Sequence, residues 1–121
     1  MIAAKHVMRY LKGMIEFGIY YDRDHDYRLY GYTDSDWVGS VADKKSSSSG
    51  CYCLGSTMIS WFSKKQSSVS LSASEAEYIA ACSACCEAMW LQKLMSGLFD
   101  MELVTIVILC DNQICIKMTK N

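Results

Sequence analysis

Three acidic residues occupy positions where carboxylates can do chemistry. Asp34 and Asp111 each stand at the carboxyl end of a predicted strand, and Glu77 stands in the first turns of a predicted helix. Functional groups collect at this end of the strands in open sheets with helical crossovers. If the two strands are parallel neighbours, Asp34 and Asp111 lie one strand spacing apart, roughly 5 Å. Two carboxylates that close repel each other unless a cation lies between them.

Carboxylates in this arrangement predict a site for hard divalent cations. Mg²⁺ binds a few carboxylate oxygens and otherwise keeps water or phosphate oxygens. Two such ions about 4 Å apart can activate a water and stabilise the leaving oxygen of a phosphodiester. The three acids therefore indicate metal-dependent phosphodiester hydrolysis.

Each acid on a helix also has a structural explanation. Asp111 or Asn112 suits the N-cap of the following helix, and Asp111 also suits its first turn, where the helix dipole favours a negative charge. Glu77 fits a capping box that begins at Ser74. A second box, Ser72 with Glu75, lies two residues earlier and leaves Glu77, about 200° further around the helix, able to point inward. The sequence alone leaves these alternatives open.

The composition of the 121 residues is that of one ordinary globular domain. Hydrophobic residues make up 51% and the net charge is −1, so the basic bias of a dedicated nucleic-acid binder is missing. Seven cysteines, spread over predicted strands and helices, indicate free thiols in a reducing compartment. The longest apolar run, Leu103 to Cys110, is far shorter than the roughly 20 residues of a membrane span, and the amino terminus lacks a secretory pattern. We expect an intracellular protein with no membrane partner.

Hydrophobic spacing predicts the elements that must position the acids. They are helices at 3–12, 74–98 and from 111 onward, strands at 17–21, 27–37 and 103–110, and a hairpin at 50–62 that turns at Gly55-Ser56. Residues 22–26 and 39–49 are expected to be loops. The run 103–110 is apolar throughout, which is typical of a parallel strand covered on both faces. The predicted fold class is therefore α/β, a mixed sheet with helices on its faces.

The helix at 74–98 has enough apolar residues for a broad buried face. The residues predicted to share that face are Ala76, Ile79, Ala80, Cys86, Met89, Trp90, Leu94 and Leu98. Trp61, Trp90 and the tyrosines are expected in the core rather than as stacking platforms. Trp37 is the aromatic residue closest to the predicted site.

Seven blocks of the sequence resemble, in order and spacing, the ribonuclease H region of copia-type LTR retrotransposon Pol polyproteins. The blocks are RYLKG, GYTDSDWVGS, DKKSSSSGCYCLG, ISWFSKKQ, LSASEAEYIAA, EAMWLQKL and CDNQ, and together they cover essentially the whole chain. The resemblance implies a ribonuclease H-like fold whose first three strands are antiparallel. It also implies that residues 1–26 are the tail of the reverse transcriptase and its connection, and that residues 27–121 are the ribonuclease H-like domain.

The resemblance further implies an activity and its site residues. The activity is endonucleolytic cleavage of the RNA strand of an RNA–DNA hybrid, supported by two Mg²⁺ or Mn²⁺ ions. The reverse transcriptase portion of the same polyprotein is the implied protein partner, in the cytoplasm, a virus-like particle or the nucleus. The family's acids fall on Asp34, Glu77 and Asp111, with Asp34 bridging both ions. Asp36 follows on the same face of the strand and is a supporting candidate.

Several polar residues are candidates for substrate contacts. The lysines that could meet phosphates are Lys44, Lys45, Lys64 and Lys65. Asn112 and Gln113 could hydrogen-bond the minor groove or the RNA 2′-hydroxyls. A solvated surface position is the alternative for each of them.

The family pattern continues into a KHID-like segment whose aspartate is the fourth metal ligand. This chain ends at Asn121, so we expect the last elements of the domain to be missing. A site with three acids is expected to bind metal weakly and to cleave slowly or not at all. One alternative is a catalytically inactive remnant that binds nucleic acid or a protein. Another is a structural module that positions the reverse transcriptase, with the helix at 3–12 packed against a neighbour.

Overall fold

The computed structural model describes residues 2–21, 28–39, 42–99 and 105–119. Its elements in chain order are α1 (Ile2–Gly13), β1 (Leu29–Asp36), β2 (Ser47–Leu54), β3 (Thr57–Lys65), α2 (Ala73–Phe99), β4 (Val107–Leu109) and α3 (Gln113–Met118). The strands form one sheet in the order β3-β2-β1-β4. β2 is antiparallel to both β1 and β3, and β4 is parallel to β1. The predicted mixed α/β sheet, consistent with a ribonuclease H-like fold, is confirmed.

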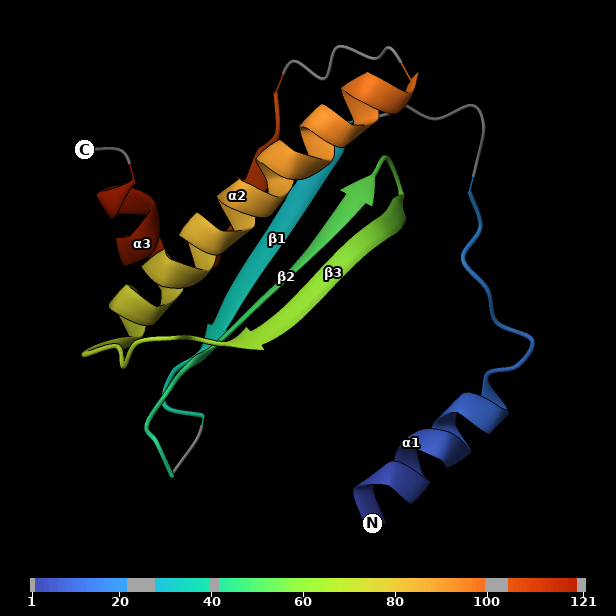
Figure 1. Cartoon of the computed structure of the whole chain (residues 1–121), viewed down its shortest axis with the longest axis horizontal. Helices are drawn as coiled ribbons and strands as arrows, with labels where there is room; N and C mark the ends of the chain where they lie inside the picture. Colours follow the sequence, from blue (N-terminus) through green and yellow to red (C-terminus); the bar gives the residue numbers. More distant parts are fainter. Residues whose placement is uncertain (1, 22–27, 40–41, 100–104, 120–121) are drawn as a thin grey trace.

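The long helix α2 covers one face of the sheet and lies along β1 (Figure 1). It approaches the strands through small side chains at four-residue spacing, which share one face of a helix. These are Ala76, Ala80, Ala84 and Ala88. Tyr52 of β2 fills the space below them and donates a hydrogen bond from its hydroxyl to the Ala84 carbonyl oxygen at 2.9 Å. Leu29 and Leu91 complete the buried cluster.

The buried face of α2 differs from the predicted one. Ala76 and Ala80 are buried as expected, but Trp90 is 55% exposed and Met89 points outward too. The sheet accepts the alanine stripe because Tyr52 already occupies the volume that larger helix residues would need. Trp61 of β3 is 69% exposed, so the expectation that both tryptophans lie in the core is wrong.

The parallel strand β4 lies at an edge of the sheet. Its direction was predicted correctly, but the expectation of a strand covered on both faces is wrong. Ile108 packs against the core under α2, whereas Val107 and Leu109 point to the opposite face and are nearly half exposed. The regular strand is also shorter than the predicted run 103–110, of which residues 103 and 104 lie outside the described part.

Residues 17–21, predicted as a strand, form no regular structure. They run beside the start of β3, where Thr57 Oγ1 donates a hydrogen bond to the Tyr20 carbonyl oxygen at 2.9 Å. Tyr21 adds a hydrogen bond from its hydroxyl to the Met58 carbonyl oxygen at 3.5 Å, so side-chain hydrogen bonds and not a strand ladder hold this segment. The loop predicted at 22–26 lies outside the described residues.

The loop predicted at 39–49 ends earlier than expected, because β2 begins at Ser47. The serine run pairs on both sides, with β1 and with β3, and this pairing outweighs the loop-like composition. The hairpin turn at Gly55-Ser56 is confirmed, and Gly55 adopts the left-handed conformation with a φ of 59°.

The amino-terminal helix α1 ends at Gly13 as predicted. It stands apart from the sheet in Figure 1, contacts no other described helix or strand, and has no buried residue. The division into segments 1–26 and 27–121 stays a prediction, since its boundary falls on residues that are not described.

A buried glutamine just after β3 joins the sheet to the first turn of α2. Gln66 Nε2 donates hydrogen bonds to Ser48 Oγ and to the Ala76 carbonyl oxygen, both at 2.9 Å. Its Oε1 accepts from Ser70 Oγ at 2.8 Å. Its backbone N–H donates to the Ser46 carbonyl oxygen at 2.8 Å. The amide of Gln66 therefore has partners at both ends and fixes where α2 begins.

We expect Gln66→Met to lower the free energy of unfolding by roughly 2–3 kcal/mol, because it keeps the volume but leaves buried partners such as Ser70 unpaired. Urea denaturation followed by circular dichroism measures this loss. Gln113→Met, at an exposed position, is the matched control and should change the free energy by less than about 0.5 kcal/mol. Equal effects of the two substitutions would contradict the role given to Gln66.

Candidate metal centre

Glu77, Cys110 and Asp111 come together between the first turns of α2 and the end of β4. One ligand atom from each residue lies within 4.8 Å of those of the other two. The Cys110 thiol donates a long hydrogen bond to Glu77 Oε2, with 3.9 Å between sulfur and oxygen. The structure thus brings two of the three predicted acids together and adds a cysteine to them.

The position of Glu77 follows from how α2 begins. Ser72 Oγ accepts a hydrogen bond from the Glu75 N–H at 3.2 Å, and Glu75 Oε2 accepts one from the Leu71 N–H at 2.7 Å. This is the earlier of the two predicted capping registers. Glu75 serves the cap, and Glu77 is buried on the inner face of the helix.

The position of Asp111 follows from how α3 begins. Asn112 is the N-cap, and its Oδ1 accepts hydrogen bonds from the N–H groups of Ile114 and Cys115 at 3.0 Å each. Of the two residues predicted as the N-cap, Asp111 and Asn112, the structure confirms Asn112. The predicted substrate contact of Asn112 stays a prediction, but its carbonyl oxygen is already used by the cap.

Asp34 lies beside the cluster of Glu77, Cys110 and Asp111. Tyr32 of β1 is in register with Leu109 of β4, so Asp34 and Asp111 follow at equivalent positions two residues further along. Both line a hollow of about 320 Å³ together with Cys110. The side chain of Asp34 belongs to the exposed face of β1, and its carboxylate is not among the mutually close ligand atoms of the described residues.

The electrostatic state of Glu77 is unusual for a carboxylate. It is only 7% exposed, and no cationic side chain of the described chain forms an ion pair with it. Burial raises its pKa above the ordinary value of 4.5, and the Asp34 and Asp111 carboxylates raise it further. Ser35 faces Glu77 and lowers the pKa, although the buried Ser35 Oγ falls short of a full hydrogen-bond geometry.

A second thiol lies behind the cluster. Burial raises the pKa of Cys115, and the neighbouring Cys110 thiol and Glu77 carboxylate raise it further. Cys115 is therefore a neutral thiol at neutral pH. All seven cysteines have free thiols, as predicted from their number and distribution.

Asp36, the supporting candidate, turns toward the end of its own strand. Its carboxylate occupies the space beside Gly39, where an added Cβ would collide with it. The position of the Asp36 carboxylate is therefore explained by its packing in the turn after β1. Its role in metal binding stays a prediction.

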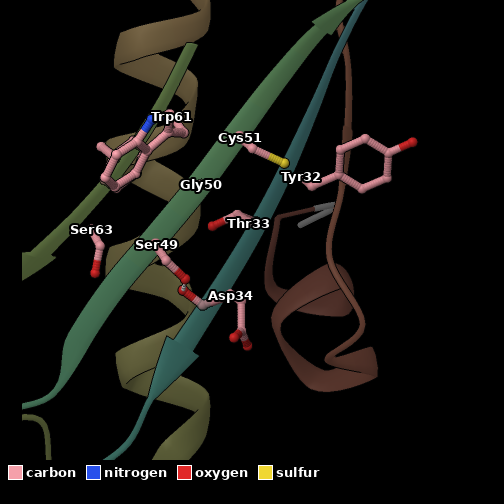
Figure 2. Close-up of a pocket in the computed structure, with 9 residues that line it drawn as sticks. Tyr32, Thr33, Asp34, Ser49, Gly50, Cys51, Trp61 and Ser63 are labelled. Carbon is pink, nitrogen blue, oxygen red and sulfur yellow. Dashed lines mark hydrogen bonds between the residues drawn. The ribbon is translucent and has the colours of Figure 1, made fainter. Parts of the chain in front are cut away.

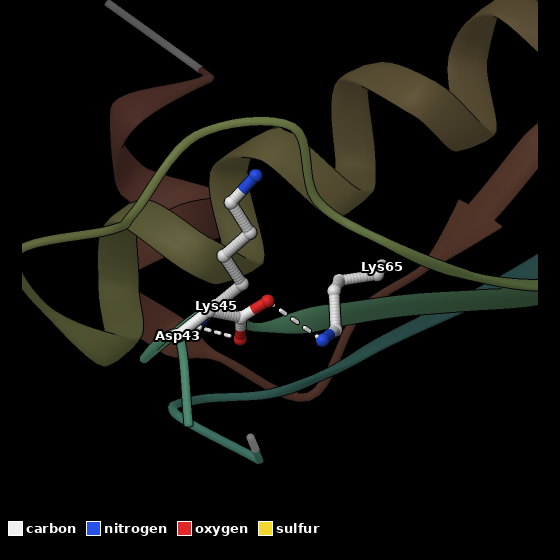
Figure 3. A network of polar contacts seen from close by, with 3 residues as sticks. All are labelled: Asp43, Lys45 and Lys65. Atoms are coloured by element: carbon white, nitrogen blue, oxygen red, sulfur yellow. Dashed lines mark hydrogen bonds and ion pairs between the residues drawn. The ribbon is translucent and has the colours of Figure 1, made fainter. Parts of the chain in front are cut away.

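The two candidate lysines at the end of β3 have contacts of different kinds. Lys65 Nζ forms an ion pair with Asp43 Oδ2 at 2.8 Å, and the Lys45 N–H donates to Asp43 Oδ1 at 3.3 Å (Figure 3). Lys64 Nζ lies 5.4 Å from the centroid of the Phe62 ring. Both partners of the ion pair are about half exposed, so it contributes little to stability.

The sheet face opposite α2 carries a hollow of about 320 Å³ that begins at Asp34. Figure 2 shows Asp34 beside Ser49, with Cys51 between Trp61 and Tyr32 further along the face. The Ser49 hydroxyl donates a hydrogen bond to the Asp34 carbonyl oxygen at 3.4 Å. The sequence did not predict these exposed aromatic rings next to Asp34, because Trp61 was expected in the core.

Comparison with known proteins finds retrotransposon Pol polyproteins among the relatives of the chain. The chain is 38% identical, over 98% of its length, to the retrovirus-related Pol polyprotein from transposon TNT 1-94 of Nicotiana tabacum. It is 37% identical, over 91% of its length, to that from transposon RE2 of Arabidopsis thaliana. This chain is similar to a region of retrotransposon Pol polyproteins. It spans 9% and 8% of those two Pol polyproteins.

A further relative of this Pol-like chain is the secreted RxLR effector protein 161 of Plasmopara viticola. The two are 42% identical over 74% of the chain, which corresponds to 63% of the effector. No family model and no solved structure matches the chain. Within the described residues, no helix combines the length and the apolar character needed to cross a membrane.

The raised pKa of Glu77 predicts a pH-dependent stability. The folded state holds the Glu77 proton more tightly than the unfolded state does. The resulting stabilisation is complete below pH 4.5, the ordinary pKa, and is lost as the pH rises through the folded pKa. In a chelator-treated sample we therefore expect Glu77→Gln to be more stable than the native chain at pH 7, with the difference vanishing near pH 4.

Thermal and urea unfolding at both pH values measure this difference. Glu16→Gln, in the exposed segment after α1, is the control and should change stability by less than about 0.5 kcal/mol at pH 7. A Glu77→Gln variant less stable than the native chain at pH 7 would show that the carboxylate has a stabilising partner.

Proposed function

We propose that this chain is a metal-dependent ribonuclease H-type endonuclease domain of a retrotransposon Pol polyprotein, acting on the RNA strand of RNA–DNA hybrids. The observation that carries the proposal is the buried Glu77 carboxylate, which lies beside Asp111 and has no cationic partner in the described chain. Buried charges in proteins are paired or coordinate metals. The similarity to Pol polyproteins supports the same assignment.

The residues present suit a hard divalent cation such as Mg²⁺ or Mn²⁺. Glu77 and Asp111 offer carboxylate oxygens within 4.8 Å of each other, and Asp34 lines a hollow with Asp111 from the other side. When bound, such ions supply charge stabilisation at the phosphodiester and a more acidic water. Relief of the mutual repulsion of Glu77, Asp34 and Asp111 favours binding of the cation.

The chain's own residues have distinct tasks in this proposal. Glu77 and Asp111 would hold the cation where α2 begins and β4 ends, and Asp34 would face it from the end of β1. Lys64 and Lys65 lie at the end of β3, where they can meet the phosphates of the bound strands. The exposed rings of Trp61 and Tyr32 offer apolar surface next to Asp34 for sugars and bases.

The reverse transcriptase portion of the same polyprotein is the proposed protein partner. α1 presents apolar side chains that no other described element covers, at positions such as Val7 and Leu11. The spacing of these two residues places them on one face of the helix. We assign the activity to the compartments where reverse transcription takes place, the cytoplasm and virus-like particles.

Cleavage of a labelled RNA–DNA hybrid with Mg²⁺ or Mn²⁺ tests the proposal. Asp34→Asn, Glu77→Gln and Asp111→Asn should each lower the rate by about 100-fold or more, which corresponds to about 2.7 kcal/mol in the barrier. Chelation should abolish cleavage by the native chain. Glu87→Gln, on α2 at a distance from Asp111, is the control expected to cleave at the native rate.

The same background cleavage in the native chain and in Asp34→Asn would refute the catalytic assignment. Binding of the hybrid, measured separately by fluorescence anisotropy, then distinguishes a chain that binds without cleaving from one that does not bind. In the proposal, binding survives in Glu77→Gln while cleavage is lost.

A further inference from the structure

Cys110 changes which metal ions the cluster at the end of β4 can hold. Its sulfur lies 3.9 Å from Glu77 Oε2, and Asp111 completes a set of three donor residues within 4.8 Å. A thiolate is a poor ligand for Mg²⁺, which takes oxygen ligands, and a strong ligand for Zn²⁺. One sulfur and two carboxylates therefore form a mixed donor set that favours Zn²⁺ more than a set of oxygens alone would.

The spacing suits a tetrahedral ion. With a Zn–S bond of about 2.3 Å and a Zn–O bond of about 2.0 Å, a sulfur and an oxygen on one tetrahedral ion lie about 3.5 Å apart. The observed separation of Cys110 Sγ and Glu77 Oε2 is 3.9 Å, close to that value. Asp111 is exposed, so its carboxylate can rotate toward the pair without disturbing the core.

The burial of Glu77 gives independent support for a cation here. The carboxylate is more than nine-tenths buried, and the Cys110 thiol that donates a hydrogen bond to it is a weak donor. Its surroundings in the described chain include two further carboxylates and no cation that pairs with it. A divalent ion bound by Glu77 and a Cys110 thiolate would neutralise this charge.

We propose that Glu77, Cys110 and Asp111 form a binding site for one thiophilic divalent cation of the Zn²⁺ class, with water in the remaining position. Three protein ligands and one open position are the arrangement of accessible rather than closed zinc sites. Because the site shares Glu77 and Asp111 with the proposed magnesium site, the two kinds of ion exclude each other. Zn²⁺ should therefore inhibit hybrid cleavage. This inhibition rests on the proposed function, whereas the binding of Zn²⁺ does not.

Titration of the reduced chain with Co²⁺ tests the binding. Co²⁺ accepts the ligands of Zn²⁺ and gives a sulfur-to-metal charge-transfer absorption that reports a bound thiolate. We expect one equivalent of Co²⁺ to produce this absorption, excess Zn²⁺ to remove it, and Cys110→Ser to abolish it. Glu77→Gln should weaken binding by about tenfold or more while leaving the absorption detectable at high Co²⁺.

Two of the three cysteines of α2 require a matched control, because they lie one helical turn apart. Cys82 and Cys86 stand four residues apart on the helix surface and could bind Co²⁺ by themselves. The double variant Cys82→Ser/Cys86→Ser should keep the absorption with unchanged stoichiometry. Absorption that persists in Cys110→Ser, that is lost in the double variant, or that is missing from the native chain would overturn the proposal.

Inhibition gives a second readout that separates the two proposals. Zn²⁺ should inhibit Mn²⁺-supported hybrid cleavage, and Cys110→Ser should raise the Zn²⁺ concentration for half-inhibition by about tenfold or more. A chain that shows the Co²⁺ absorption but does not cleave contradicts the proposed function alone. A chain that cleaves but shows no Co²⁺ absorption contradicts the thiophilic site alone.

Discussion

The placement of the candidate metal centre depends on the buried amide of Gln66. This side chain binds β2 through Ser48, the loop before α2 through Ser70, and the first turn of α2 through the Ala76 carbonyl oxygen. Glu77 is the next residue after Ala76, so the network that fixes the start of the helix also fixes the carboxylate. Further along, the alanine stripe and Tyr52 hold α2 close to the sheet.

The same arrangement makes ionisation of Glu77 at the candidate metal centre unfavourable. Glu77 is buried near Asp34 and Asp111, and each of these neighbours makes its ionised form less favourable. A fold selected for stability alone would place an apolar or amide side chain at this position. The cost is understandable if a cation normally offsets it, and this is why the buried acid carries more weight than the exposed ones.

Much of the fold could be predicted because local patterns and tertiary structure agree. The hairpin turn at Gly55 and the capping box of Ser72 with Glu75, which leaves Glu77 able to point inward, followed from short-range rules. The buried face of α2 did not, since the helix carries two apolar stripes and only the shape of the sheet decides which one fits. The exposure of Trp61 was not predicted for a similar reason, because hydrophobicity does not tell which sheet face a helix will cover.

The candidate site, like the fold, could be predicted from the sequence only in part. Strand ends and capping motifs in the sequence pointed to Asp34, Glu77 and Asp111. Cys110 was read as part of an apolar strand and as one of seven free thiols, but not as a metal ligand, because its distance to Glu77 depends on how α2 crosses the sheet. A cysteine directly before a strand-end aspartate is the signal that could have marked it.

Paramagnetic Mn²⁺ tests the central claim, that these acids form a single cation site, without depending on catalysis. Small amounts of Mn²⁺ added to the isotope-labelled chain should first broaden the amide resonances of Asp34, Ser35, Glu77 and Asp111, and Glu77→Gln should remove this selectivity. Broadening that is uniform, or that begins at Asp43 or another acid outside the centre, would contradict the account.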